Sequence, residues 1–164
     1  MSEPMFFEKI ISGGQTGVEQ GALDAALELS FPCGGWCPKG RKSENGRIPD
    51  KYPLKEDPSP NHSTILEANV KNSDGTLIFT YGPLDNESTL TIEFVKKYGR
   101  PCRVIDLKQT SPENAVKKVF TGWIYQEWLI SDLNVRGPRE SKYPGIQETV
   151  KKIMTKAIVI AVFE

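Results

Sequence analysis

The sequence predicts an α/β fold with a mostly parallel sheet of about five strands. Strand-like and helix-like segments alternate along its 164 residues, which is typical of β–α–β crossovers. The segment Gly75–Thr80 is apolar nearly throughout, as expected of a strand that is covered on both faces. A Gly-rich turn joins the first predicted strand to a helix. We expect residues 1–164 to form one ligand-binding domain.

The first elements in chain order are a strand over residues 6–12 and a helix over 17–29, whose apolar residues recur at helical spacing. Residues 31–37 form only a weak extended segment, because they hold two glycines and a proline. Residues 38–62 form a long cationic loop that contains five prolines. We expect this loop to be ordered and to lie near the binding site.

The later elements alternate more regularly. We expect a buried strand first, then a helix that ends at a glycine, and then a further strand. The next helix begins with Ser-Pro-Glu. The last helix ends in Ile158–Phe163, which reads equally well as a strand. The predicted ranges are helix 62–70, strand 75–80, helix 88–98, strand 102–107, helix 111 to about 129, strand 133–135 and a helix from 144.

Ligands of open parallel sheets bind beyond the carboxyl ends of the strands, near the point where the strand order reverses. The turns 13–17, 81–88 and 137–141 all follow predicted strands. Gly, Pro, Ser, Thr and charged residues concentrate in these turns. We therefore expect the three turns to share one edge of the sheet and to form the site.

The first of these turns reads Gly13-Gly14-Gln15-Thr16-Gly17. Its glycines allow a close approach of the backbone to a ligand, and the helix that follows offers free N–H groups to an oxyanion. Gln15 and Thr16 add amide and hydroxyl partners. The turn lacks the lysine of the nucleoside triphosphatase loop and the spacing of dinucleotide binders. It predicts a phosphate-binding loop.

The last turn reads Gly137-Pro138-Arg139-Glu140-Ser141. Arg139 can hold an oxyanion through two hydrogen bonds. Glu140 can orient a hydroxyl group or serve as a general acid or base. Alternatively, Arg139 and Glu140 form a surface ion pair of little energetic weight.

Composition narrows the function classes. Lys and Arg together number 21, as do Asp and Glu, which argues against a nucleic-acid or membrane-surface binder. The sequence shows neither a signal peptide nor an apolar run long enough for a membrane span. A reducing cytoplasm is the expected location, since three cysteines make no disulfide framework.

Several residues of types that often bind metals or ligands are assigned structural roles. One histidine and no second cysteine pair leave a metal site incomplete, so Cys33, Cys37 and Cys102 are expected to be buried thiols and no metal is predicted. His62 is interpreted as a surface or helix-start residue. The aromatic residues at helical spacing are expected to lie in the core or in a homo-oligomer contact; they are Trp123, Tyr125 and Trp128.

Four stretches of the sequence are informative in combination: Ile11–Gly17, Gly35–Arg41, Ile48-Pro49 with Tyr52, and Asn134–Ser141. Together they resemble the molybdenum cofactor carrier protein family. The resemblance implies a Rossmann-like three-layer sandwich, related to the nucleotide-handling proteins that include the phosphoribohydrolases. It also implies that the molybdenum cofactor is the bound ligand, which would make molybdoenzymes candidate partners.

The chemistry of that ligand agrees with the motifs. The cofactor carries one phosphate, a flat pterin and an anionic metal-oxo end, and Lys39, Arg41 and Arg139 can meet its negative charge. Gly82 and Ser88 of the 81–88 turn complete the predicted site.

Two positions depart from the family pattern. Gln20 stands where the family has an arginine, and Asn86-Glu87-Ser88 replaces a Gly-Gly-Thr turn. We expect the carboxylate of Glu87 to repel a phosphate placed there.

Three functions fit these residues. The first is a non-enzymatic carrier that binds a small phosphorylated pterin or nucleotide-like ligand. The second is a hydrolase that cleaves the N-glycosidic bond of a nucleoside monophosphate, with Glu140 or Glu19 as its carboxylate. The sequence lacks the Pro-Gly-Gly turn of those hydrolases, which favours the carrier. The third is a nucleotide-sensing module.

Overall fold

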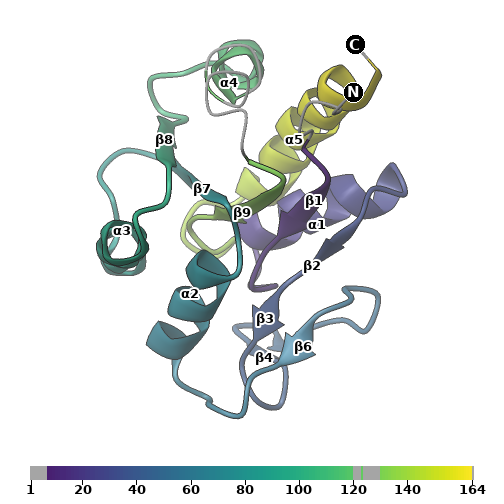
Figure 1. The fold of residues 1–164 in the computed structure, drawn as a ribbon. Coiled ribbons are helices and arrows are strands. Elements are labelled where there is room, and N and C mark those ends of the chain that lie inside the picture. Colours follow the sequence, from purple (N-terminus) through teal and green to yellow (C-terminus); the bar gives the residue numbers. More distant parts are fainter. Residues whose placement is uncertain (1–6, 120–122, 124–129, 164) are drawn as a thin grey trace, which may run out of the picture.

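The computed structural model describes residues 7–119, 123 and 130–163. Five parallel strands form a central sheet in the order β2-β1-β9-β7-β8 (Figure 1). The predicted α/β class with a parallel five-stranded sheet is therefore confirmed. The strands are β1 (Lys9–Ile11), β2 (Cys33–Gly34), β7 (Gly75–Thr80), β8 (Cys102–Asp106) and β9 (Asp132–Arg136).

Strand β9 occupies the centre of the sheet although it is the last strand in the sequence. It pairs with β1 through Ile10 opposite Leu133, and with β7 through Leu77 opposite Val135. These four side chains are fully buried. Strand β7 is buried along its whole length, as its continuous apolar character predicted.

Helices cover both faces of the sheet and complete a three-layer sandwich (Figure 1). On one face α1 (Val18–Glu28) packs against α5 (Ile146–Phe163), and α5 also contacts α4 (Pro112–Val119). On the other face α2 (His62–Lys71) packs against α3 (Asn86–Tyr98). None of the helices among the described residues is long and apolar enough to cross a bilayer.

The segment Ile158–Phe163 belongs to helix α5, so the strand alternative for it is wrong. Its β-branched residues favour a strand locally. However, Ile153, Met154, Ala157 and Ile158 are all buried, and this spacing places them on one side of a helix. Packing of that side into the core decides the conformation.

The segment 31–37 divides into β2 and β3 (Trp36–Cys37), and the long loop contains three more short strands. Strand β3 pairs with β6 (Lys55–Glu56), whereas β4 (Lys42–Ser43) and β5 (Gly46–Arg47) form a hairpin. Ile48 and Tyr52 are buried. These contacts confirm that the loop is ordered.

The helix expected from residue 111 to about 129 is described only as far as Val119, where α4 ends. Trp123 is buried in the core, as predicted. Tyr125 and Trp128 lie outside the described residues.

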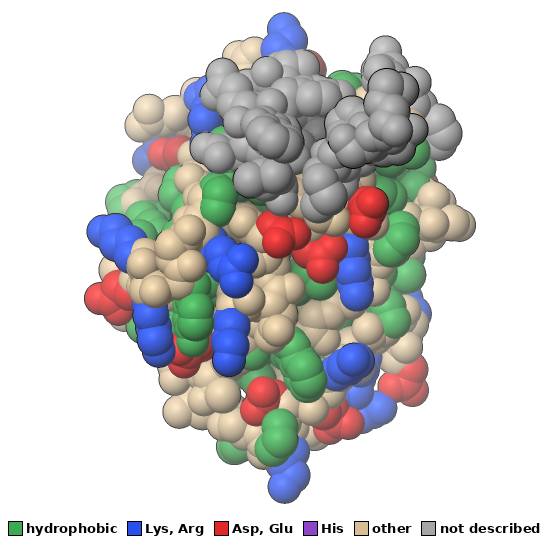
Figure 2. All heavy atoms as spheres, viewed as in Figure 1, with side chains coloured by type: hydrophobic (Ala, Val, Ile, Leu, Met, Phe, Trp, Pro, Cys, Tyr) green, Lys and Arg blue, Asp and Glu red, His purple; other side chains and the backbone are tan. Residues whose placement is uncertain are grey.

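The surface shows the charge balance of the composition. Lys and Arg side chains are interspersed with Asp and Glu side chains over the face seen in Figure 2. This distribution agrees with the equal numbers of cationic and anionic residues in the chain.

Gly17→Ala should destabilise the protein far more than Gly46→Ala. Both glycines have a positive φ, 83° and 99°, which costs an alanine about 1–3 kcal/mol. A Cβ atom on Gly17 would also lie 2.6 Å from the backbone nitrogen of Glu140, whereas one on Gly46 would meet nothing within 4 Å. Urea unfolding measures both free energies, and equal losses would contradict the close approach of the two turns.

Candidate ligand-binding site

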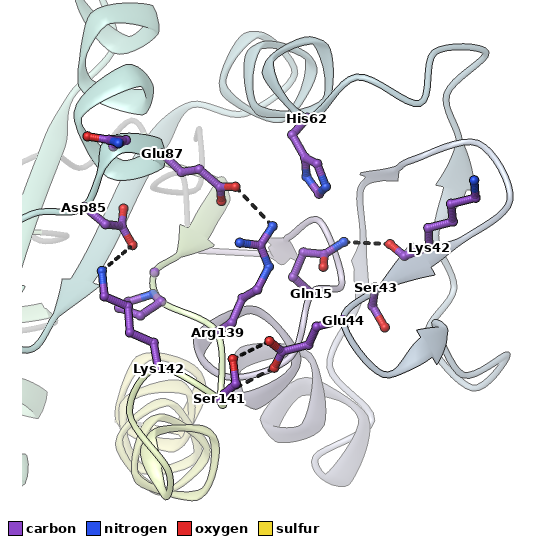
Figure 3. A pocket seen from close by; sticks show the side chains of 13 residues that line it. Gln15, Lys42, Ser43, Glu44, His62, Asp85, Glu87, Arg139, Ser141 and Lys142 are labelled. Carbon is purple, nitrogen blue, oxygen red and sulfur yellow. Dashed lines mark hydrogen bonds and ion pairs between the residues drawn. The ribbon is translucent and has the colours of Figure 1, made fainter.

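The carboxyl ends of β1, β7 and β9 lie at one edge of the sheet, and the segments that follow them surround a cavity of about 640 Å³ (Figure 3). Small-molecule sites commonly have this size. The β4–β5 hairpin and the start of α2 add a second wall. The lining residues are Gln15, Lys42, Ser43, Glu44, His62, Asp85, Asn86, Glu87, Gly137, Pro138, Arg139, Ser141 and Lys142.

Five of the residues proposed from the sequence line this cavity: Gln15, Gly137, Pro138, Arg139 and Ser141. Thr16 is connected to it through a hydrogen bond from its hydroxyl group to Glu44. The other predicted residues do not line it, and they are Gly13, Gly14, Gly17, Lys39, Arg41, Gly82, Ser88 and Glu140.

The first turn is buried beneath the last turn and does not present a row of free N–H groups. Gln15 N–H donates to Glu19 Oε1 (3.3 Å), and Gly17 N–H donates to Gln147 Oε1 (3.0 Å). Val18 N–H donates to the Pro138 carbonyl (3.2 Å). Our expectation of free donors is therefore wrong at these three positions, because protein acceptors already satisfy them.

Arg41 holds the long loop together and does not face the cavity. Its buried guanidinium donates to the carbonyl groups of Pro49 (2.7 Å) and Tyr52 (2.9 Å), and also to those of Ile48 and Leu54. Lys39 is exposed and does not line the cavity. The cations that do line it are Lys42, Arg139 and Lys142.

Glu140 caps the start of α5. Its carboxylate accepts hydrogen bonds from the N–H groups of Gly145 (2.6 Å) and Gln147 (2.9 Å), where the helix dipole favours a negative charge. The geometry therefore gives Glu140 a structural role in place of the acid or base role considered for a hydrolase.

The 81–88 turn contributes different residues from those expected. Gly82 N–H donates to Asp106 Oδ1 (2.8 Å), and Ser88 is buried at the start of α3. Asp85 caps α3 by accepting from Ser88 N–H (2.7 Å). The lining residues of this segment are Asp85, Asn86 and Glu87.

Each arginine near the sheet edge is paired with a carboxylate. Arg139 Nη2 lies 3.0 Å from Glu87 Oε1, and Arg136 Nη2 lies 3.5 Å from Glu87 Oε2. The sequence led us to expect repulsion between Glu87 and a phosphate. The structure shows that Glu87 also neutralises the cations that such a phosphate would use.

Glu19 lies beneath these pairs and is almost fully buried. Burial raises the pKa of its carboxyl group, and Arg136, whose Nη2 lies 3.9 Å from Oε2, opposes the shift. Arg136 also donates to Thr91 Oγ1 (3.0 Å). Glu87 of the cavity wall thus contacts a buried polar cluster held by β9, α1 and α3.

Gln15 provides an acceptor that the protein leaves unused. Its Nε2 donates to the Lys42 carbonyl (2.9 Å). Because a carbonyl can only accept, this bond fixes the orientation of the amide. Oε1 is buried without a hydrogen-bond partner in the structure. A ligand with an N–H or O–H donor would satisfy it.

Besides Glu87, seven lining residues were not among the predicted site residues, namely Lys42, Ser43, Glu44, His62, Asp85, Asn86 and Lys142. His62 is the first residue of α2 and is exposed, as interpreted, but it lines the cavity. Lys42 and Glu44 lie in the loop that we placed near the site, so that placement was the one signal for them.

The expectation of buried thiols is confirmed for Cys37, which is fully buried, whereas Cys33 and Cys102 are only half-buried. Partial or full burial raises the pKa of all three thiols, that of Cys102 to about 11. Across the described residues, no group of three or more His, Cys, Asp or Glu side chains is arranged to hold a metal ion.

Comparison with known proteins identifies the family of this chain. The model of the circularly permutated YpsA SLOG family matches residues 10–158. The chain belongs to that family. A crystal structure from Syntrophus aciditrophicus SB, titled "Putative molybdenum carrier protein", is 41% identical and has a TM-score of 0.88; the match covers 95% of this chain and 98% of that one. A comparison with curated protein sequences found no match.

The strand order shows what the permutation means in this SLOG protein. Counted from β9 through β1, β2, β7 and β8, the sheet reads 3-2-1-4-5, which is the Rossmann order. The order therefore reverses between β9 and β7. The segments after these two strands line the cavity, as the rule for open sheets predicts. Residues 137–141 thus follow the strand that comes first in a Rossmann chain, where phosphates bind.

Arg41→Lys should loosen the long loop, because an ammonium group cannot reach four carbonyl groups at once. We expect faster hydrogen exchange across residues 41–54 and a loss of about 1–3 kcal/mol in unfolding free energy. Lys39→Ala, at an exposed neighbour, is the matched control. Unchanged exchange in Arg41→Lys would contradict the structural role.

Glu19→Gln should change the pH dependence of stability. The pKa of Glu19 is raised above its ordinary value of 4.5, so the folded protein keeps a proton that the unfolded chain has lost. Wild-type stability should therefore fall, relative to the Gln variant, as the pH rises from 4.5 through the raised pKa. Urea unfolding of both proteins across this interval tests the sign, and a wild-type stability that rises with pH relative to the Gln variant would refute it.

Proposed function

We propose that this protein is a carrier that binds a phosphorylated heterocycle in the 640 Å³ cavity without converting it, with the molybdenum cofactor as the leading candidate. The observation that carries the proposal is the cavity between the turns after β9 and β7, into which Arg139 points (Figure 3). The name of the Syntrophus relative supports the choice of ligand.

The cavity offers partners for both parts of such a ligand. Arg139, Lys142 and Lys42 line it and can meet negative charge. The free Oε1 of Gln15 and the carboxylate of Glu87 can accept hydrogen bonds from the N–H groups of a pterin or purine ring. A ligand that carries both an anion and N–H donors fits this mixture better than a simple anion.

The contacts of Glu140 favour a carrier over an N-glycosidic hydrolase. A hydrolase needs a carboxylate near the ribose that is free to react. Both oxygens of Glu140 are instead occupied by N–H groups at the start of α5.

Ligand-induced stabilisation tests the proposal. The molybdenum cofactor, a phosphorylated pterin and a nucleoside monophosphate would each be added during thermal unfolding. A ligand present at 100 times its Kd should add about 2.7 kcal/mol. Arg139→Ala should remove most of this gain, because it deletes a cation from the cavity wall.

The control is Arg103→Ala, which changes a cation of β8 that does not line the cavity. Chromatography of the recovered ligand shows whether it is intact. Release of a free base from the nucleotide would refute the carrier and favour the hydrolase. Stabilisation by none of the three compounds would refute the binding site.

A further inference from the structure

Glu44 joins the two turns of the site from outside. It lies at the tip of the β4–β5 hairpin, and its carboxylate accepts hydrogen bonds from the hydroxyl groups of Thr16 and Ser141. It also accepts from Ser141 N–H (3.2 Å). Figure 3 shows the carboxylate beside Ser141, at the edge of the cavity.

These donors are the kind that bind oxyanions. Two hydroxyl groups and one N–H group converge on the oxygens of Glu44, and Arg139 is near enough to favour its negative charge. A phosphate oxygen can accept from the same donors, since carboxylates and phosphates use similar contacts. Thr16 and Ser141 come from the two turns that the sequence predicted to bind an anion.

Glu44 itself is exposed to solvent. When the Glu44 carboxylate leaves the two turns it is hydrated by solvent, so its displacement avoids the large free-energy cost of leaving a carboxylate buried and unpaired. The hairpin is further attached by the bond from Gln15 Nε2 to the Lys42 carbonyl (2.9 Å). Movement of the hairpin would break this bond and free the whole amide of Gln15 for a ligand.

We propose that Glu44 is an internal oxyanion, which occupies the subsite for the ligand's phosphate and must be displaced on binding. The inference rests on the proposed function and adds the position of the phosphate, between Thr16 and Ser141. Glu44 thereby determines specificity, because a ligand must out-compete a tethered carboxylate. A tethered competitor multiplies the apparent association constant of the ligand by the fraction of molecules in which the competitor is not bound.

Removal of the carboxylate should therefore strengthen anion binding. Inorganic phosphate and guanosine monophosphate would be titrated calorimetrically into wild type, Glu44→Ala and Glu93→Ala. Glu93 is an exposed carboxylate of α3 that does not line the cavity, so its removal controls for net charge. We expect Glu44→Ala to bind both compounds about tenfold more tightly than wild type, and Glu93→Ala to match wild type.

A second substitution ties the gain to the subsite. Adding Ser141→Ala to Glu44→Ala should cancel most of the gain, because it removes one of the donors. Hydrogen exchange supplies an independent measure in the wild type: residues 42–47 should exchange faster when phosphate is bound, because the hairpin has been released.

The outcomes separate this inference from the proposed function. If Glu44→Ala binds phosphate no better than wild type, while binding of guanosine monophosphate still depends on Arg139, the internal-anion inference is wrong and the carrier stands. Weaker binding by Glu44→Ala would mean that Glu44 contacts the ligand, which also overturns the inference. If no protein binds either compound, the internal-anion inference fails, and the carrier proposal is decided by the stabilisation test with the molybdenum cofactor and the phosphorylated pterin.

Discussion

The structure depends on the contact between the turn after β1 and the turn after β9. Gly17 packs against the backbone of residues 138–140 so closely that a methyl group would collide with it. The Val18 N–H donates to the Pro138 carbonyl, which fastens the start of α1 to the turn that leads into α5. This contact is possible because β1 and β9 are neighbours in the sheet. It sets the position of Arg139 and Ser141, and through them one wall of the cavity.

Electrostatic pairing governs the other wall. Glu87, from the start of α3, satisfies Arg139 and Arg136 at once, and Glu44 satisfies the donors of Thr16 and Ser141. Both arginines and both hydroxyl groups are therefore already paired with carboxylates of the protein. An anionic ligand gains from these arginines only by displacing a carboxylate, or by offering donors that the carboxylates accept. This requirement favours a ligand of mixed polarity over a simple anion.

The class of fold and the edge of the sheet that holds the cavity could be predicted from the sequence, because both follow from local patterns. The apolar run of β7 and the Gly-rich turn after β1 each give a signal within a few residues. Partners could not be predicted in the same way. The sequence placed Arg41 among the ligand contacts, yet its guanidinium binds carbonyl groups of its own loop. Glu140 likewise caps a helix, although the sequence offered it as a general acid or base.

The sequence by itself determined the alternation of strands and helices, the family and the turns that border the cavity, since each depends on short stretches of residues. Only the tertiary structure decided which charges neutralise each other. Glu44 and Ser141 are far apart in the chain and adjacent in space, as are Glu87 and Arg139. Hydrogen bonds between such distant residues depend on strand order and on the path of the long loop. The Gly-rich turn shows both contributions. Its residues predicted an anion site, whereas the acceptors of the Gly17 and Val18 N–H groups come from the C-terminal part of the chain.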